Sequence, residues 1–520
     1  MSDRLHEPFD RTHGNSVSPT AFSSDLSETM GDLSEDLQGN VTSLNLSIPT
    51  APPPSPERLG ELINEINDQV VEDATVSEVE NESYGLLIFL VVTATAFFIG
   101  YLLKRQNVKW MHETSASLLF GCLLGLIIKV VPDDNFLSII GKDDLLALRS
   151  SLLFHADFFF LVLLPPIIFE AGFNTVPTVL RNKFWYNLDA ICTYAFLGTL
   201  LSTAVVGFGV HLTGYVGLCV PLTLLHSLCF GSLISATDPV TTLAIFQELG
   251  ADLDLYALVF GESVLNDAVA IVLYQTAVSF QDIDVDSYNI WMAFLQFGTI
   301  FCGSVFVGVA VALFTSLLLK HTSLHEKEFE VNESGIVVLM PYISYVIAVA
   351  LDLSGIIAIL FCGIAMARYT VCHVSPSAYA IVHNMYRMTA GIFECFIFVY
   401  MGSAIFLFKL PWGTHIPLAV VSLLWCVAGR YANIWICTPL INAWRRDSNQ
   451  ISPNFKKGLL SSGLRGGIAF ALALSTQSDL HGQDESVAIV TSTIGIVTLF
   501  GVPPAGRVCG HCDIHHRHCD

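Results

Sequence analysis

The sequence predicts an all-α polytopic membrane protein with about thirteen transmembrane helices. Of its 520 residues, 53% are hydrophobic and only 13% are charged, and the mean hydropathy is +0.60. The chain is therefore more apolar, and less charged, than a soluble protein of this length. Apolar runs of roughly 20 residues, the length that spans a bilayer, also recur through most of the chain.

The apolar runs define the candidate spans in chain order. The eighth and the ninth nearly touch, so the boundary between them is weak. The spans cover approximately residues 85–103, 115–131, 152–171, 188–212, 218–246, 255–280, 291–319, 335–351, 354–368, 388–408, 416–440, 457–475 and 486–503.

Lysine and arginine gather on one side of these spans. If residues 1–84 lie outside, 13 basic residues fall in the inward loops and 4 in the outward loops. Positive charge marks the cytosolic side of a membrane protein. The bias therefore supports an odd number of spans and predicts a cytosolic C-terminus.

Residues 1–84 differ in composition from the rest of the chain. They carry 17 acidic side chains and three arginines and contain few aromatic residues, which is typical of a disordered segment. We expect an acidic luminal or extracellular tail with glycosylation acceptors at Asn40 and Asn45. No cleavable signal peptide is evident, so the first span would direct insertion. Residues 85–503 would form the transmembrane domain.

Charged side chains inside the spans indicate where function lies. Asp267 and its neighbour Asn266 lie in the sixth span, and a carboxylate in an apolar span marks by default an ion or proton pathway. Glu262 and Arg430 are further intramembrane charges, and because an unpaired buried ion is very costly, we infer that they pair. Asp267 is then free to titrate. Glu394 has no obvious mate, and we treat it as an interface or support residue.

Two spans contain helix-weakening interruptions. Thr237 and Asp238 precede Pro239 in the fifth span, and Arg465 lies among glycines in the twelfth. If spans one to six and eight to thirteen are repeats, both interruptions fall in the fifth helix of a repeat, which indicates a transporter site at the repeat interface. The Asp238 and Arg465 charges could offset the half-helix ends of the facing break. Carbonyl groups freed at such a break could coordinate a bare cation.

These motifs resemble those of the eukaryotic sodium/hydrogen exchangers of the cation/proton antiporter superfamily. The resemblance runs from about Trp110 to Gly501. Two further segments look most like the endomembrane branch, at residues 255–258 and 353–358. The motifs that carry the family resemblance lie at residues 260–270, 164–172, 237–240, 429–430 and 463–466.

The resemblance implies a homodimer with a dimerisation domain and a mobile core domain that moves like an elevator. It also implies two inverted repeats with crossed discontinuous helices. Asp267 would be the cation- and proton-binding carboxylate and Asn266 its neighbour, with Thr237 and Asp238 contributing from the broken helix. Glu262 and Arg430 would be the structural ion pair.

The resulting hypothesis is electroneutral exchange of a monovalent cation, Na⁺ or K⁺, for a proton, which regulates luminal or cytosolic pH. Sodium prefers oxygen ligands, and hydroxyls such as those of Ser263 and Thr237 could supply them beside Asp267. The chain would be no enzyme and would need no cofactor and no nucleic acid. The protein would be embedded in membrane lipid, in the Golgi or endosome rather than in the plasma membrane. The sequence does not identify a regulatory partner.

Two alternatives belong to other classes. An intramembrane aspartyl protease also needs two membrane aspartates, but the second usually follows a Gly-x-Gly motif, whereas Asp267 follows Leu265 and Asn266.

The second alternative is a cation channel, which needs a continuous pore. Flux that is limited by turnover and driven by a pH gradient would favour the antiporter.

The last residues, 504–520, would form a short cytosolic tail in place of the long regulatory region that family members generally carry. A Cys-x-x-Cys with nearby histidines can hold zinc. A tail this short, without a partner module, favours accidental sequence from an altered reading frame or splice, so we expect no metal site. The cysteines and histidines concerned are Cys509, Cys512, His515, His516, His518 and Cys519.

Overall fold

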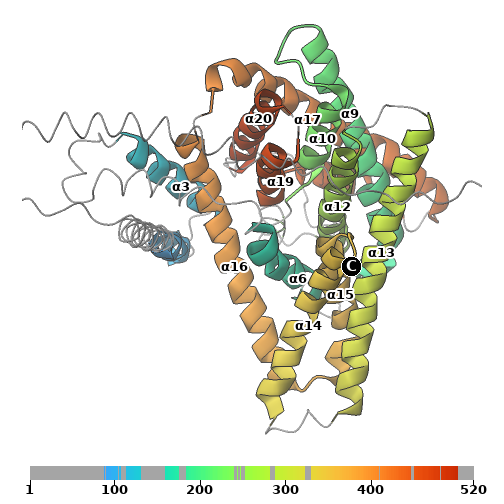
Figure 1. The fold of residues 1–520 in the computed structure, drawn as a ribbon. Coiled ribbons are helices and arrows are strands. Elements are labelled where there is room, and N and C mark those ends of the chain that lie inside the picture. Colours follow the sequence, from blue (N-terminus) through green and yellow to red (C-terminus); the bar gives the residue numbers. More distant parts are fainter. Residues whose placement is uncertain are drawn as a thin grey trace, which may run out of the picture. The chain divides into compact units, whose positions relative to one another are not determined.

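The computed structural model describes residues 90–103, 113–130, 159–174, 183–238, 252–281, 287–322, 329–408, 410–446, 450–480 and 482–501, with a few single positions. Both terminal tails lie outside the described residues, and so do the predicted glycosylation sites, the Cys/His segment and Pro239. Every labelled element in the described part is helical (Figure 1).

The first labelled elements, up to the sixth predicted span, are α3 (Glu113–Val130), η1 (Phe159–Leu163), α6 (Leu164–Asn174), α8 (Leu188–Thr193), η2 (Tyr194–Gly198), α9 (Thr199–Tyr215), α10 (Leu224–Ser235) and α12 (Leu253–Ser279). The later elements are α13 (Ser287–His321), α14 (Glu330–Ala350), α15 (Gly355–Ala365), η4 (Met366–Thr370), η5 (Val371–His373), α16 (Pro376–Leu407), α17 (Trp412–Trp444), α18 (Pro453–Ser461), α19 (Gly467–Asp479) and α20 (Gln483–Gly501).

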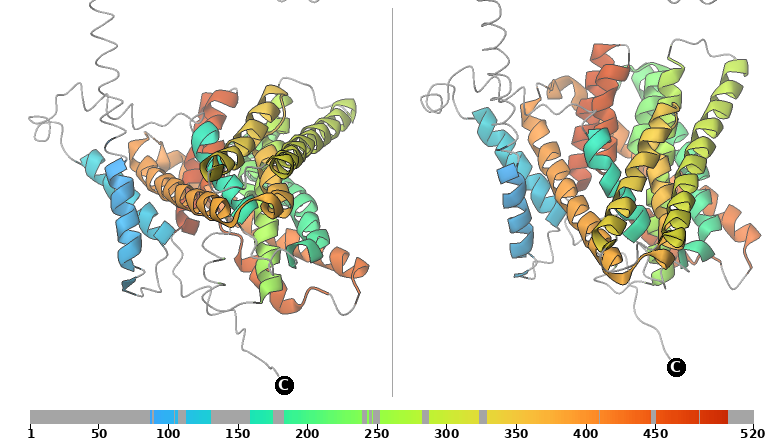
Figure 2. Two further views of the ribbon diagram at one scale, coloured as in Figure 1. Left: turned by 90° about the horizontal axis from the view of Figure 1, so that it is seen from below. Right: turned by 60° about the horizontal axis from the view of Figure 1, so that its bottom comes forward.

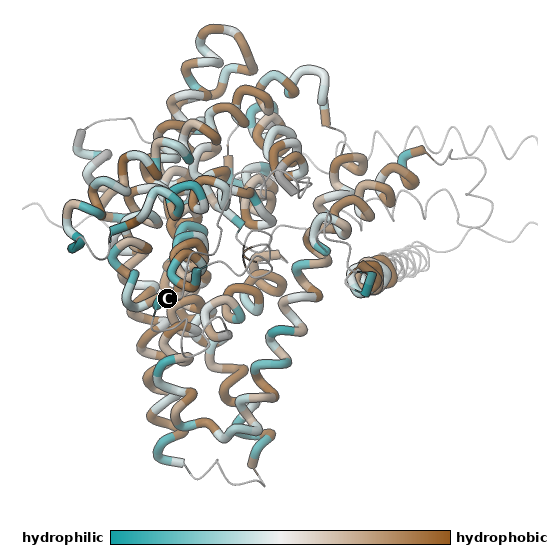
Figure 3. Tube along the Cα trace, turned by 180° about the vertical axis from the view of Figure 1, so that it is seen from behind, coloured by the Kyte–Doolittle hydropathy of each residue, from teal (hydrophilic) through white to brown (hydrophobic). Residues whose placement is uncertain are grey.

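The described helices have the length and composition of membrane spans. Eight are long and apolar enough to cross a bilayer, and three shorter helices are also apolar. Figure 3 shows hydrophobic residues along much of their length, as lipid-facing and core-facing helices require. The weak boundary between the eighth and ninth predicted spans is a real turn between α14 and α15, where Asp352 has a φ of 55°. The number thirteen stays a prediction.

The helices pack in two groups (Figure 1 and Figure 2). The first, the broken-helix group, contains α8, α9, α10, α12, α17, α18, α19 and α20, which pack mainly against one another. The second, the long-helix group, contains α3, α6, α13, α14, α15 and α16. The groups meet mainly where α12 contacts α13 and where α16 contacts α19 and α20.

Two helices of the first group are interrupted, and the interruptions cross. Helix α10 ends at Ser235, and the chain then continues in extended form from Ala236. Helices α18 and α19 are separated by non-helical residues 462–466. The two segments touch directly, because the Asp238 backbone N–H donates to the Leu464 carbonyl at 2.8 Å. The structure thus contains the crossed discontinuous helices that the sequence predicts.

A double proline shapes α6 of the second group. Pro165 and Pro166 have no backbone N–H, so the carbonyls one turn earlier lose their helical donors. The chain there forms the π-turn η1, and tyrosines of α14 take over the exposed acceptors. Tyr342 donates to the Leu161 carbonyl, and Tyr345 donates to the Phe160 carbonyl at 3.0 Å. Each acceptor is satisfied inside the protein, as the bilayer interior demands.

Glycines bring α3 and α16 into backbone contact. A Cβ added at Gly121 would lie 2.0 Å from the Val399 carbonyl oxygen, and one at Gly402 would lie 2.2 Å from the Leu118 carbonyl oxygen. Gly125 meets the backbone of Ser403 in the same way. Small residues one turn apart let membrane helices approach this closely. We call this contact the glycine seam.

Candidate functional site

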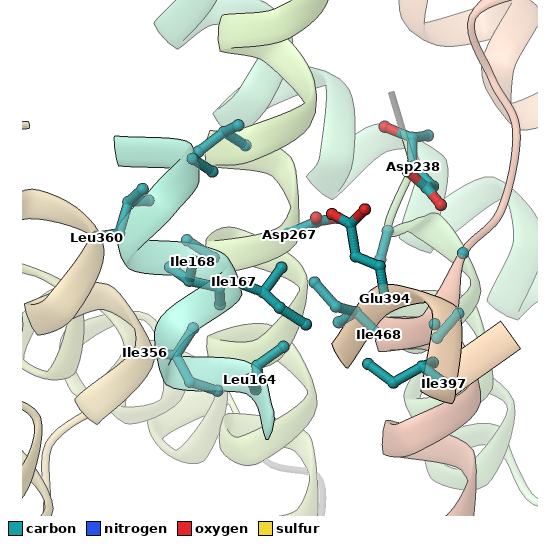
Figure 4. A pocket seen from close by; sticks show the side chains of 18 of the residues that line it. Leu164, Ile167, Ile168, Asp238, Asp267, Ile356, Leu360, Glu394, Ile397 and Ile468 are labelled. Atoms are coloured by element: carbon teal, nitrogen blue, oxygen red, sulfur yellow. The ribbon is translucent and has the colours of Figure 1, made fainter. Parts of the chain in front are cut away.

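A cavity of about 180 Å³ lies between the two helix groups, at the crossing of the broken helices. Its wall is mostly apolar, with residues such as Ile168, Leu360 and Ile468 (Figure 4). Carboxylates are concentrated in this apolar setting, where each is costly unless it holds a proton or a cation. The acidic residues that line the cavity are Glu170, Asp238, Asp267 and Glu394.

Asp267 lies near the middle of α12 and lines the cavity. Its Oδ1 atom is buried and has no hydrogen-bond partner among the described residues. A buried carboxylate oxygen without a donor is expensive. This atom is therefore the acceptor in the site that most needs a proton or a metal cation.

Asn266 is turned toward the broken helix instead. Its Oδ1 accepts from Thr199 at 2.6 Å, and its Nδ2 donates to the Ser235 carbonyl at 2.9 Å and to the Thr237 hydroxyl at 3.1 Å. Asn266 is 3% exposed, and it is not among the residues that line the cavity. Its amide thus holds α9, α10 and α12 together, while Asp267 beside it faces the cavity.

Ser263 and Thr237 form a second link between α12 and the break. The Ser263 hydroxyl donates to the Thr237 carbonyl, and the Thr237 hydroxyl lies 3.3 Å from that of Ser263. Thr237 lines the cavity, whereas Ser263 does not. Of the five residues predicted to bind the cation or proton, the cavity is therefore lined by Asp267, Asp238 and Thr237.

The carbonyls of the broken helix already have protein donors. Arg465 Nη1 donates to the Ser235 carbonyl at 2.8 Å and to the Ala236 carbonyl at 3.2 Å. Ser235 also accepts from Asn266, as described above. A carbonyl oxygen has two lone pairs, so the Ala236 and Thr237 oxygens can each accept one more partner. The sequence indicated freed carbonyls but did not show these donors.

Arg465 also compensates the electrostatics of the break. It is 3% exposed, and its guanidinium lies at the C-terminal end of α10, where the helix dipole is negative. Asp238 lies beside Gly466, the residue before α19, since a Cβ added there would lie 2.4 Å from the Asp238 Cβ. An acidic group at a helix N-terminus is favourable. Each charge therefore lies at the half-helix end that it stabilises.

Glu262 and Arg430 form a buried bidentate ion pair. The two guanidinium nitrogens Nη1 and Nη2 donate to the two carboxylate oxygens, the second at 2.9 Å. Arg430 Nε and Nη2 also donate to the Leu459 carbonyl, at 3.1 and 2.5 Å, and Nη2 donates to the Ser462 hydroxyl at 3.0 Å. Arg430 thereby joins α12, α17 and the end of α18, a third element that the sequence did not indicate.

Glu394 comes from α16 of the long-helix group and lines the cavity. Figure 4 labels it among the side chains that line the cavity, together with Asp267 and Asp238. Among the described residues, no lysine or arginine forms an ion pair with Glu394. It lies in the cavity wall, on the side that the long-helix group forms. Glu170 of α6 also lines this wall, although its otherwise apolar sequence motif gives no signal of a functional role.

Comparison with known proteins places this architecture in a family. The family model "Sodium/hydrogen exchanger, transmembrane" matches residues 93–505. Sodium/hydrogen exchanger 5 of Arabidopsis thaliana is 36% identical over 441 residues, which cover 82% of this chain and 82% of the relative. Sodium/hydrogen exchanger 8 of Homo sapiens is 35% identical over 437 residues, which cover 82% of this chain and 71% of the relative.

A solved structure has a similar fold. The sodium proton antiporter of Methanocaldococcus jannaschii superposes with a TM-score of 0.61 at 17% sequence identity, and the match covers 83% of this chain and 98% of that chain. This likeness supports the arrangement of helices around the crossed breaks. With the match of the family model over most of its length, the chain belongs to the sodium/hydrogen exchanger family of membrane antiporters.

Proposed function

We propose that this protein exchanges one monovalent cation, Na⁺ or K⁺, for one proton, and that Asp267 binds both in turn. The observation that carries the proposal is the buried Oδ1 atom of Asp267, which has no donor among the described residues and belongs to a side chain that lines the cavity. Family membership makes a cation and a proton the expected pair of substrates.

Competition for one carboxylate explains how exchange would work. A proton or a cation can neutralise Asp267, but the two cannot occupy the same oxygens together. Na⁺ and K⁺ prefer oxygen ligands, and Thr237, Asp238 and the spare lone pair of the Thr237 carbonyl lie beside the cavity. Ser263 would contribute once its hydroxyl turns from that carbonyl. When Asp267 holds neither a proton nor a cation, its uncompensated negative charge would prevent the broken-helix group from moving across the membrane.

The two helix groups suggest how the site changes sides. Asp267 and both breaks belong to the broken-helix group, whereas Glu394 and Glu170 belong to the long-helix group. The cavity lies between the groups, so sliding one past the other would carry Asp267 while the opposite wall stays in place. Alternating access of the elevator type is consistent with this division.

Assembly and location follow from the sequence resemblance. We propose a homodimer in Golgi or endosomal membranes that sets luminal or cytosolic pH. Asn40 and Asn45 would then carry glycans in the lumen. The relatives named above include exchangers 5 and 8, and the segments at residues 255–258 and 353–358 of this chain look most like the endomembrane branch.

Reconstitution tests the proposal. The purified protein is placed in proteoliposomes that contain an internal pH dye, and Na⁺, K⁺, Li⁺ or choline is added outside against a proton gradient. We expect saturable proton movement with Na⁺ or K⁺ and none with choline. Proton flux that does not depend on the added cation would reject antiport. Cation flux that continues without a counter-flow of protons would support the channel alternative instead.

A further inference from the structure

Thr199 lies outside the family motifs named above, but its side chain contacts Asn266, the neighbour of Asp267. It is the first residue of α9 and is 1% exposed. Its Oγ1 lies 2.6 Å from Asn266 Oδ1 and 2.5 Å from the carbonyl of Ala195, one helical turn earlier. A threonine hydroxyl commonly bonds back to its own helix, so the contact with Asn266 must be weighed against that ordinary role.

The hydrogen bonds of Asn266 fix which end of its amide faces Thr199. The Asn266 Nδ2 atom faces the Ser235 carbonyl, which can only accept, and this fixes the orientation of the amide. The oxygen Oδ1 must then face Thr199. The single hydroxyl proton of Thr199 lies within reach of two acceptors, Asn266 Oδ1 at 2.6 Å and the Ala195 carbonyl at 2.5 Å, and the two share it. Thr199 is thus a side-chain donor to the Asn266 amide oxygen as well as to its own helix.

A π-turn brings Thr199 to this position. Residues Tyr194–Gly198 form η2 between α8 and α9. A π-turn holds one residue more than an α-turn, so it rotates the following helix by about 100°. Gly198 allows the turn to pack, because a Cβ there would lie 2.1 Å from Asn433 Oδ1. Without the extra residue, the Thr199 side chain would be rotated by about 100° from its present direction toward Asn266.

We propose that Thr199 is a positioning residue for cation binding, acting through the Asn266 amide. Thr199 holds the amide oxygen, and the amide nitrogen in turn holds the Ser235 carbonyl and the Thr237 hydroxyl. Asp267 follows Asn266 on α12, so the same contact sets the distance between its carboxylate and the break. The inference rests on the proposed function, because it concerns the affinity of that site.

Three variants separate the hydroxyl from the packing of the side chain. Thr199→Val keeps the shape and removes the donor, and Thr199→Ser keeps the donor and removes the methyl group. Thr203→Val is the matched control, because Thr203 lies four residues later on the same helix and its hydroxyl is 3.5 Å from that of Ser235. Cation KM and maximal rate are measured by proteoliposome exchange, and cation-dependent thermal shifts are measured on purified protein.

We expect Thr199→Val to raise the cation KM by roughly five- to hundredfold, since a buried acceptor loses its donor. Its cation-dependent thermal shift should shrink in parallel. Thr199→Ser should restore the wild-type KM, and Thr203→Val should match the wild type. An unchanged KM in Thr199→Val, or a Thr199→Ser variant as impaired as Thr199→Val, would overturn the inference.

The two proposals fail in different ways. A wild-type protein that exchanges no cation for protons would overturn the proposed function. The role of Thr199 would then be decided by the thermal shifts alone, with loss of the cation-dependent shift in Thr199→Val and its return in Thr199→Ser as the supporting result. Equal shifts in all four proteins would reject it.

Discussion

Arg430 donates to both carboxylate oxygens of Glu262 inside the membrane domain, and the same guanidinium also donates to the Leu459 carbonyl. Glu262 is 2% exposed and Arg430 is 6% exposed, so neither charge is solvated by bulk water. The pair neutralises one of the two carboxylates of α12 that lie near the break. Asp267 is left as the one that faces the cavity.

The ion pair predicts an asymmetric response to mutation. Arg430→Ala should destabilise the protein by about 3–5 kcal/mol, because it leaves the Glu262 charge buried without a partner. Adding Glu262→Gln should recover part of this loss, since the stranded charge disappears. A thermal-shift double-mutant cycle measures the coupling. Losses that simply add would contradict the pairing.

Asp267→Asn should abolish exchange while expression and thermal stability stay close to wild type. The amide keeps the size of the side chain but cannot release a proton or neutralise a cation. Asp352→Asn is the matched control, because it makes the same chemical change at an exposed turn. Dye-monitored exchange in proteoliposomes measures both variants. Substantial transport by Asp267→Asn would remove Asp267 from the mechanism.

Exchange should be electroneutral. With Glu262 neutralised by Arg430, and with Asp267 as the group that binds proton and cation in turn, one cation crosses for each proton. The membrane potential of proteoliposomes can be set with valinomycin and potassium while sodium-driven proton flux is recorded. We expect the rate and the reversal point to be independent of voltage. A reversal point that follows voltage would require a second transported charge.

Neighbouring glycines at the crossing should tolerate alanine differently. Gly466→Ala would place a methyl group 2.4 Å from the Asp238 Cβ and 2.6 Å from its Oδ2, whereas Gly467→Ala would meet a single close atom, Ile397 Cγ2, at 2.7 Å. Asp238 is held by the crossing and Ile397 is β-branched, so neither side chain moves away freely, but the overlap is larger at Gly466. We expect Gly466→Ala to cost about 1–3 kcal/mol and most of the activity, and Gly467→Ala to have a smaller effect on both. Thermal shift and exchange assays compare the two, and equal effects would contradict this packing.

Charge made part of the site predictable from sequence. A charged group in an apolar span needs a partner or a function, so Glu262, Arg430 and Asp267 could be singled out without a structure. The two breaks were visible because proline and glycine weaken helices. The same cost argument could have drawn attention to Glu170, but its motif reads as a continuous apolar helix.

The contacts of neutral side chains could not be predicted in this way. A threonine in an apolar helix, such as Thr199, carries no hydropathy signal, and the π-turn before it changes the helix register without changing composition. The donors on the carbonyls of Ser235 and Thr237 come from residues far away in the sequence. Tertiary packing alone decides these hydrogen bonds.

The glycine seam limits which parts of the molecule can slide. At Gly121 and Gly402 the nearest atoms across the interface belong to backbone, so no side chain can rotate to let α3 and α16 pass each other. A larger side chain in place of either glycine would collide with a backbone carbonyl oxygen. The two helices can therefore pack in only one register relative to each other, and we expect them to move as one rigid unit. Where α19 meets α16, by contrast, the atom nearest to an added Gly467 Cβ is a side-chain methyl group, Ile397 Cγ2, and no backbone carbonyl lies within 4 Å, so relative movement of the two helix groups is less restricted there.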